Sequence, residues 1–266
     1  MNNSVWQKAI ISPCEQYHTI NGEPLYMKRF EQVMKYHEPG LAPAKDLTGA
    51  YHIDIEGNAV YQRRFTGSFG FYEGLAAVEM DGDWFHINHL GEEIYPEKYS
   101  WCGNFQEGFC VVRDKDGRYF HIDKQGYRAY LESYEYAGDF KDGVSVICNN
   151  ESLHTHIDYS GYFLHEQWFI DLDVYHKGFA RAKDSKGWFH VNRQGQAAYL
   201  QRYLNVEPFY NGAARVECFN GELIIINKQG VKLTQIRKPQ QRAWQQLSDD
   251  MVGFWRTEVV ATAAQL

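Results

Sequence analysis

The sequence predicts an all-β repeat protein, and three observations support this fold class. A Phe-x-x-Gly motif recurs along the chain, a His-Ile-Asx motif follows it in each copy, and aromatic residues make up 16% of the sequence. Aromatic residues favour β-strands, and self-similarity at a fixed period is typical of repeat architectures. The longest aliphatic run covers only residues 223–226, whereas a membrane-spanning helix needs roughly 18 apolar residues.

The Phe-x-x-Gly motif sets the period of the repeat. It ends in an anchor glycine, and successive anchor glycines lie 34 or 35 residues apart. The six anchor glycines are Gly40, Gly74, Gly108, Gly143, Gly178 and Gly212. Hydrophobic and small residues follow each of them, so we expect a first strand there, as in residues 74–80.

A histidine motif defines the second strand of each unit. Its histidine always lies 22 residues before the next anchor glycine. In the first copy, the stretch from the histidine to the turn glycine, residues 18–22, is one residue shorter than in the others. The seven units are anchored at His18, His52, His86, His121, His156, His190 and Ile225. All length variation falls between the glycine and the following histidine, where pairs such as Asp81-Gly82 predict a hairpin turn.

An Asx-x-x-Gly turn follows the second strand, as in residues 88–91. Asx at the first position and glycine at the fourth are typical of a type I turn. A third strand is expected over 93–99, and the aromatic segment 99–101 is a candidate fourth strand. Seven such units, spanning residues 1–236, predict a closed β-propeller, because closure removes exposed sheet edges. An open β-solenoid is the alternative.

The second strand also carries a family resemblance. Residues 84–88 and 188–192 share a leading tryptophan and a closing Asx, with Ile87 in the first of them. This pattern resembles the WG-containing repeat family over residues 17–236, although phenylalanine replaces the glycine and histidine replaces the tyrosine of the family pattern. The resemblance implies a binding or scaffold module and supplies no catalytic residues.

The histidines and the aromatic residues two positions before them are the candidate site. Apolar neighbours such as Phe85 and Ile87 place one strand face in the core, while His86 shares the other face with Asn88. A neutral imidazole bonded to that neighbouring side chain or to a backbone carbonyl would have a structural role. Ligand contact is the alternative, and its candidates are Trp84, His86, Tyr119, His121, His156, Trp188 and His190.

Metal binding and catalysis are not expected. One histidine per unit does not bring metal ligands together, and His154 with His156 lacks a visible third ligand. The chain has 27 Lys and Arg against 34 Asp and Glu, a net charge of −7, which argues against nucleic acid or an anionic membrane as partner. Five cysteines without a Cys-x-x-Cys pair favour reduced thiols and a cytoplasmic location. We expect a peptide or protein partner.

The tail, residues 237–266, differs from the repeats. Apolar residues recur there at helical spacing, and residues 254–266 resemble the opening helix of the dimerisation region of small-molecule O-methyltransferases. The resemblance implies a truncated downstream domain that would use S-adenosylmethionine, whereas the repeats themselves need no cofactor. The leading hypothesis is a non-catalytic platform that presents a peptide or protein substrate to a fused methyltransferase. A structural or oligomerisation scaffold, and an enzyme with its site in the array, are the alternatives.

The tail generates the first testable prediction. A helix over 249–266 would place Met251, Phe254, Trp255 and Val259 on one apolar face, which needs a cover. If the cover is the same helix of a second copy, the protein is a homodimer. Deleting residues 240–266 should then give a monomer with intact repeats in sedimentation experiments. An unchanged monomeric mass with and without the tail would contradict dimerisation and favour docking on the repeats.

Overall fold

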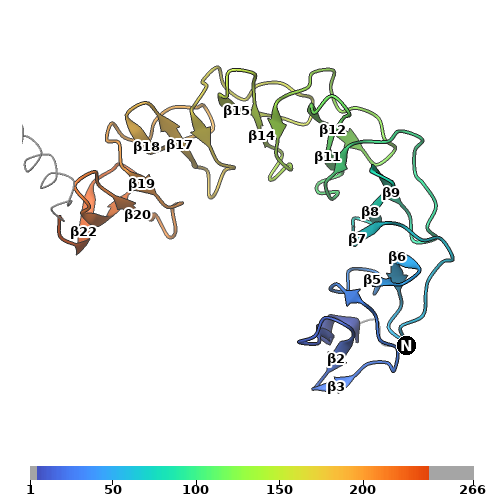
Figure 1. Cartoon of the computed structure of the whole chain (residues 1–266). Helices are drawn as coiled ribbons and strands as arrows, with labels where there is room; N and C mark the ends of the chain where they lie inside the picture. The colour runs from blue at the N-terminus through green and yellow to red at the C-terminus, as the bar shows by residue number, and fades with distance from the viewer. Residues whose placement is uncertain (1–4, 240–266) are drawn as a thin grey trace, which may run out of the picture. The chain divides into compact units, whose positions relative to one another are not determined.

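The computed structural model describes residues 5–239, which fold into short antiparallel sheets and one 3-10 turn, η1 (Trp6–Lys8) (Figure 1). The chain divides into two compact units between Leu164 and His165. The predicted helical tail, including 249–266, lies outside the described residues. The all-β repeat class is confirmed over the described part of the chain.

The first unit contains five three-stranded sheets, whose strands pair in sequence order. We number the sheets 1 to 5 along the chain. Sheet 1 has β1 (Ile10–Ile11), β2 (His18–Ile20) and β3 (Glu23–Pro24); sheet 2 has β4 (Gln32–Val33), β5 (Ala42–Asp46) and β6 (Gly49–Ile53). Sheet 3 has β7 (Gly67–Tyr72), β8 (Leu75–Met80) and β9 (Asp83–Ile87); sheet 4 has β10 (Trp101–Cys102), β11 (Phe109–Arg113) and β12 (Tyr119–Asp123). Sheet 5 has β13 (Tyr136–Ala137), β14 (Ser145–Cys148) and β15 (His154–Ile157).

The second unit contains sheets 6 and 7 within its described residues. Sheet 6 has β16 (Asp171–Leu172), β17 (Ala180–Asp184) and β18 (Gly187–Val191). Sheet 7 has four strands, β19 (Asn205–Val206), β20 (Ala213–Glu217), β21 (Leu223–Asn227) and β22 (Lys232–Arg237).

The predicted first and second strands, which follow the anchor glycine and carry the histidine, form as the sequence predicts. In sheet 3 they are β8 and β9, which pair from Ala76 with Ile87 to Met80 with Asp83. Asp81 and Gly82 connect them with φ values of 54° and 86°, the left-handed pair of a type I′ hairpin turn. The hairpin prediction is therefore confirmed.

The predicted third strand does not form over 93–99, whereas the equivalent segment of the last repeat does form it, as β22 beside β21. Only isolated bridges form over 93–99, from Glu93 to Ile87 and from Tyr99 to Trp84. The segment between these bridges turns inward because Tyr95 reaches back to the buried histidine of its own repeat, so the chain does not continue beside β9. The aromatic segment 99–101 is not a fourth strand of its own repeat. Its last residue, Trp101, begins β10 and pairs with β11 of the next sheet.

The anchor glycine also lies in a turn that the sequence analysis did not identify. Glu107 and Gly108 have φ values of 55° and 83°, and Gln106 and Phe109 on either side exchange backbone hydrogen bonds of 2.8 and 3.1 Å. This arrangement is a second type I′ hairpin. A Cβ on Gly108 would meet no atom within 4 Å, so the backbone conformation, not space, requires glycine there.

The Asx-x-x-Gly turn brings neighbouring repeats into contact. Asp123 Oδ1 accepts hydrogen bonds of 2.9 Å from the amides of Gln125 and Tyr127, as expected for an Asx turn. Gly126 has a φ of 86°, and a Cβ there would lie 2.5 Å from Tyr95 of the preceding repeat. Glycine therefore provides both the conformation and the space for the neighbouring tyrosine ring.

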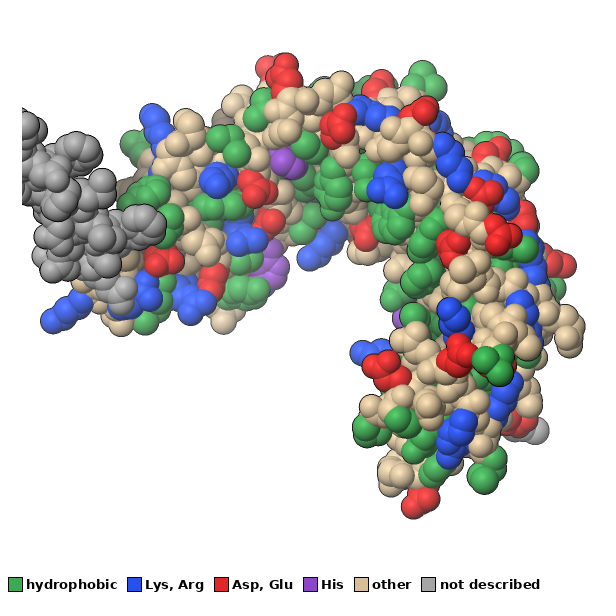
Figure 2. Space-filling view, in the orientation of Figure 1, with side chains coloured by type: hydrophobic (Ala, Val, Ile, Leu, Met, Phe, Trp, Pro, Cys, Tyr) green, Lys and Arg blue, Asp and Glu red, His purple; other side chains and the backbone are tan. Residues whose placement is uncertain are grey.

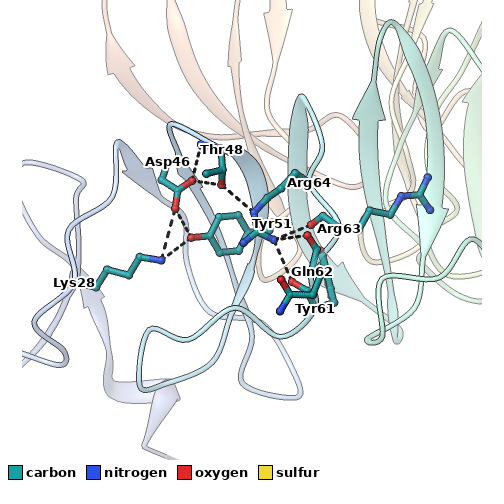
Figure 3. Close-up of polar contacts among 8 residues, drawn as sticks. All are labelled: Lys28, Asp46, Thr48, Tyr51, Tyr61, Gln62, Arg63 and Arg64. Carbon is teal, nitrogen blue, oxygen red and sulfur yellow. Dashed lines mark hydrogen bonds and ion pairs between the residues drawn. The ribbon is translucent and has the colours of Figure 1, made fainter.

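Cationic side chains close the loops that carry these tyrosines, as Figure 3 shows for Arg64. Its Nη1 donates to the carbonyls of residues 61–63 at 3.0 to 3.1 Å, and its Nε donates to Thr48 Oγ1 at 3.0 Å. The guanidinium also lies 3.7 Å from the ring centroid of Tyr51. One side chain thus fixes both the loop and the outer side of a core aromatic ring.

Asp46 completes the polar cluster of Figure 3. Its Oδ2 accepts a hydrogen bond of 2.6 Å from Tyr51, and Lys28 lies 3.6 Å away. Although partial burial works in the opposite direction, hydrogen bonds from Thr48 and Tyr51 and the charge of Lys28 lower the pKa of Asp46 to about 2. The carboxylate is therefore ionised throughout the physiological range.

Candidate functional site

The candidate histidines form buried bridges between neighbouring sheets. His121 is fully buried; its Nδ1 lies 2.6 Å from the hydroxyl of Tyr130, and its Nε2 lies 2.8 Å from the carbonyl oxygen of Gly138. Because a carbonyl only accepts, Nε2 carries the proton, and Nδ1 accepts the hydrogen bond from Tyr130. The neutral imidazole of β12 thus joins the loop of its own repeat to the chain that follows β13.

Four other histidines repeat this bridge, with the tyrosine eight or nine residues later and the carbonyl 16 or 17 residues later. They are His18, His52, His86 and His190, with Tyr26, Tyr61, Tyr95 and Tyr199 and the carbonyls of Met34, Phe69, Gly103 and Glu207. His156 is also fully buried, and His165 stands nine residues after it in place of the tyrosine.

The surroundings keep these imidazoles neutral. Desolvation by burial lowers the pKa of His52, His86, His121 and His190 to about 4, partly offset by the hydrogen bond to the carbonyl. The anchor aromatic residue of the next repeat also covers the ring, as Phe140 does at 4.2 Å from His121. Both nitrogens of each bridging imidazole have partners, so a ligand would have to displace the bridge to reach them.

Two details of the histidine prediction are corrected. The sequence analysis placed only the neighbouring residues in the core, but Phe85, His86 and Ile87 are all buried. The partner is not the Asx two residues later either, because Asn88 accepts hydrogen bonds from its own turn at Leu90. The carbonyl partner matches the prediction, whereas the tyrosine was missed.

The three candidate aromatic residues, Trp84, Tyr119 and Trp188, lie at the first or second position of β9, β12 and β18 and are partly exposed. Trp84 stacks on Phe69 with ring centroids 5.1 Å apart. Tyr119 lies between two further aromatic rings, Trp101 at 6.3 Å and Tyr136 at 5.8 Å. The planes of these neighbours are inclined to Tyr119 by 58° and 54°, so the three rings form walls and not a stack.

These walls enclose a cavity of about 400 Å³ between sheets 4 and 5, which we call the aromatic cavity. Its lining residues are Trp101, Val111, Arg113, Tyr119, Tyr136, Ala137, Gly138 and Asp139. The sequence analysis identified only Tyr119 among them. The spacing of 35 between Trp101 and Tyr136, one repeat length, is the signal that could have revealed two more.

A carboxylate without a partner lies in this cavity. Asp139 is exposed to solvent and has no hydrogen bond or ion pair with any residue in 5–239; desolvation by the surrounding walls nevertheless raises its pKa. Arg113 also lines the cavity but has other partners, because its Nε donates to Ser100 Oγ at 3.0 Å, and its guanidinium lies 5.8 Å from the ring centroid of Tyr119. The cavity therefore combines aromatic walls with the unpaired carboxylate of Asp139 and the guanidinium of Arg113.

The face of the molecule drawn in Figure 2 carries charges of both signs. Figure 2 shows Lys and Arg interspersed with Asp and Glu over the face in view. Over the described residues, no three His, Cys, Asp or Glu side chains come together as metal ligands would. No helix in residues 5–239 has the length and apolar character needed to cross a membrane.

Comparisons with known proteins agree with the repeat assignment. The family model named "WG containing repeat" matches residues 53–84 and 84–119, which confirms the predicted resemblance in these two stretches. The comparison with curated proteins gives no match.

Several solved structures have a similar backbone at low sequence identity. The computationally designed Ika8 protein is 12% identical, with a TM-score of 0.47 over 86% of this chain and 83% of that chain. BamB from Moraxella catarrhalis is 14% identical, with a TM-score of 0.46 over 82% and 78%. Hsv2 from Kluyveromyces lactis is 9% identical, with a TM-score of 0.43 over 76% and 79%. All three TM-scores lie below 0.5, and closure of the seven units into a propeller stays a prediction.

The histidine bridge predicts the effect of removing one hydroxyl. Tyr130→Phe leaves the buried Nδ1 of His121 without its donor, so the free energy of unfolding should fall by about 1–3 kcal/mol. Tyr127→Phe is the control, because its side chain is 71% exposed. Urea unfolding of both variants measures the difference, and equal stability of the two would contradict the bridge.

The buried histidines also predict how stability depends on pH. Their folded pKa of about 4 lies below the ordinary value of 6.5. As the pH falls below 6.5, the unfolded chain binds protons that the folded chain does not, so stability is lost. Between pH 7 and pH 5 the loss is about 2 kcal/mol for each of His52, His86, His121 and His190. Asp46 stays ionised over this window. A urea midpoint that does not change between pH 7 and pH 5 would contradict neutral, buried imidazoles.

Proposed function

We propose that this array of WG containing repeats is a non-catalytic binding module, which holds a peptide or protein segment in the aromatic cavity of sheets 4 and 5. The observation that carries the proposal is the group of partly exposed rings, Trp101, Tyr119 and Tyr136, around a cavity of about 400 Å³. Tyrosine and tryptophan are preferred anchors of binding surfaces because they combine large apolar area with a polar tip.

The cavity is built on the rigid part of the repeat. Tyr119 stands two residues before His121 on β12, and His121 bonds the carbonyl of Gly138, which lines the cavity. The same bridge therefore sets the distance between the wall on sheet 4 and the wall on sheet 5. A cavity whose walls are fixed before binding loses less conformational entropy when a ligand enters.

The size of the cavity fits this use. Its volume of about 400 Å³ lies at the lower end of the range of small-ligand pockets, roughly 300–1,000 Å³. It can take one or two side chains of a peptide, with further contacts along the neighbouring repeats. Trp84, stacked on Phe69 in sheet 3, and Trp188 in sheet 6 hold the equivalent positions in other repeats.

The finer form of the proposal concerns residues 254–266. Their resemblance to the dimerisation region of small-molecule O-methyltransferases favours a role in presenting the bound segment to a fused methyltransferase, with S-adenosylmethionine as the cofactor of that enzyme. This tail lies outside the described residues, and a purely structural or oligomerising scaffold is the competing function. Binding at the aromatic cavity separates the two, because a scaffold has no need of it.

A random peptide library displayed on phage tests the proposal. We expect enriched peptides whose affinity falls at least tenfold, about 1.4 kcal/mol, when Tyr119→Ala removes the central ring of the cavity. Tyr127→Ala, an exposed tyrosine that does not line the cavity, is the matched control and should bind normally. The binding function is contradicted if no peptide is enriched, or if both variants bind equally well.

A further inference from the structure

In the second unit, positions equivalent to the lining of the aromatic cavity surround a cationic side chain of the chain itself, Arg181. Counted from the anchor glycines Gly108 and Gly178, Val111 and Arg181 are equivalent positions. Counted from the histidines, Tyr119 and Trp188 are equivalent. The repeat frame thus places a long cationic side chain in sheet 6 where sheet 4 has a short apolar one.

Arg181 has three kinds of partner. Its Nη1 donates to the carbonyl of Val206 at 3.1 Å, its guanidinium lies 5.6 Å from the ring centroid of Trp188, and it forms an ion pair with Asp173. A ring face, a backbone carbonyl on the next sheet and a carboxylate are groups that stabilise a planar cation. Sheets 6 and 7 therefore show how this repeat holds a guanidinium.

The aromatic cavity has the same kinds of group and lacks a side chain in the position of Arg181, although its carboxylate comes from another position, because the equivalent of Asp173 is Gly103. Tyr119 takes the place of Trp188, and Ala137 is the equivalent of Val206, six residues before its anchor glycine. Asp139 supplies an unpaired carboxylate, and two further rings, Trp101 and Tyr136, enclose the space. The side chain of Val111 is too short to fill it.

The cation already present in the cavity does not occupy this position. Arg113 is the equivalent of Lys183, because both stand five residues after an anchor glycine. Lys183 lies 5.7 Å from the ring centroid of Trp188 while Arg181 lies 5.6 Å from it. The repeat of sheet 6 thus accommodates two cations beside the ring of Trp188. By analogy, Arg113 leaves room for a second cation beside Tyr119.

We propose that the aromatic cavity binds the cationic end of an arginine or lysine side chain of the partner, in the place that Arg181 holds in sheet 6. This inference names the ligand class of the site under the proposed function and rests on it. Asp139 would pair with the cation, Trp101, Tyr119 and Tyr136 would face it, and the carbonyl of Ala137 would accept a hydrogen bond from it.

The experiment uses n-butylguanidinium chloride as probe, with sodium butyrate and n-butanol as the anionic and neutral counterparts of similar length. The signal is the indole N–H of Trp101 in NMR spectra of the full chain, assigned with Trp101→Phe. We expect a saturable shift with n-butylguanidinium, and at least tenfold weaker responses to butyrate and butanol. Asp139→Asn, an exposed position, should weaken binding of the cation at least threefold.

Exchanging the residues of the two equivalent positions, 111 and 181, provides the sharpest control. Val111→Arg should fill the cavity from within, as Arg181 does in sheet 6, and abolish the response of Trp101. Arg181→Val should open the equivalent space and add a second saturable response at the indole of Trp188. If butyrate or butanol shifts Trp101 as strongly as the cation does, the inference is wrong. A folded Val111→Arg variant that still binds n-butylguanidinium would contradict it as well.

The outcome also separates this inference from the proposed function. Enriched peptides together with no response to n-butylguanidinium would overturn the cationic ligand and leave the binding module. A specific response to n-butylguanidinium without any enriched peptide would overturn the binding of peptides and leave the cation site.

Discussion

A neutral histidine that accepts from a tyrosine and donates to a backbone carbonyl holds the array together. In the repeat of His121 the donor is Tyr130 and the acceptor is Gly138 at the entry to the next repeat. The hydrogen bond to Tyr130 is buried and the one to Gly138 is partly buried, so losing either one leaves a largely desolvated polar atom without a partner. The imidazole must be neutral for this bridge, because a protonated Nδ1 could not accept the hydrogen bond from the tyrosine.

The same tyrosine carries the coupling into the following repeat. Tyr95, which bonds His86, also packs against Gly126 of the next Asx turn, where any side chain would collide with its ring. Each repeat therefore depends on its neighbour through polar and steric contacts that recur with the period of the sequence. Stability in such an array is a sum of repeat terms and nearest-neighbour terms, and here the histidine, tyrosine and turn glycine supply the neighbour terms.

Differences between repeats, and not the repeated frame, give the candidate site its chemistry. Val111 and Arg181 occupy one position of the repeat, yet Val111 lines a cavity, whereas Arg181 reaches the carbonyl of Val206 on the next sheet. The position of Asp139, four residues before the anchor glycine, holds no other carboxylate, so the unpaired charge belongs to one repeat only; the equivalents are Tyr36, Gly70, Asn104, Val174 and Pro208. Substitutions at a few equivalent positions can therefore give individual repeats different binding properties while the fold of the array stays the same.

The sequence by itself determined the repeat, its period, the hairpin of the glycine strand and the histidine strand, and the Asx turns, because these depend on residues close together in the chain. Only the tertiary structure decided that 93–99 is not a strand and that Tyr95 turns inward to His86. Strand alternation could not reveal this, since both faces of the second strand are buried and period two then carries no information. The aromatic cavity was equally hidden, because Trp101 and Tyr136 meet Tyr119 across different strands, and such pairing is set by the packing of neighbouring sheets.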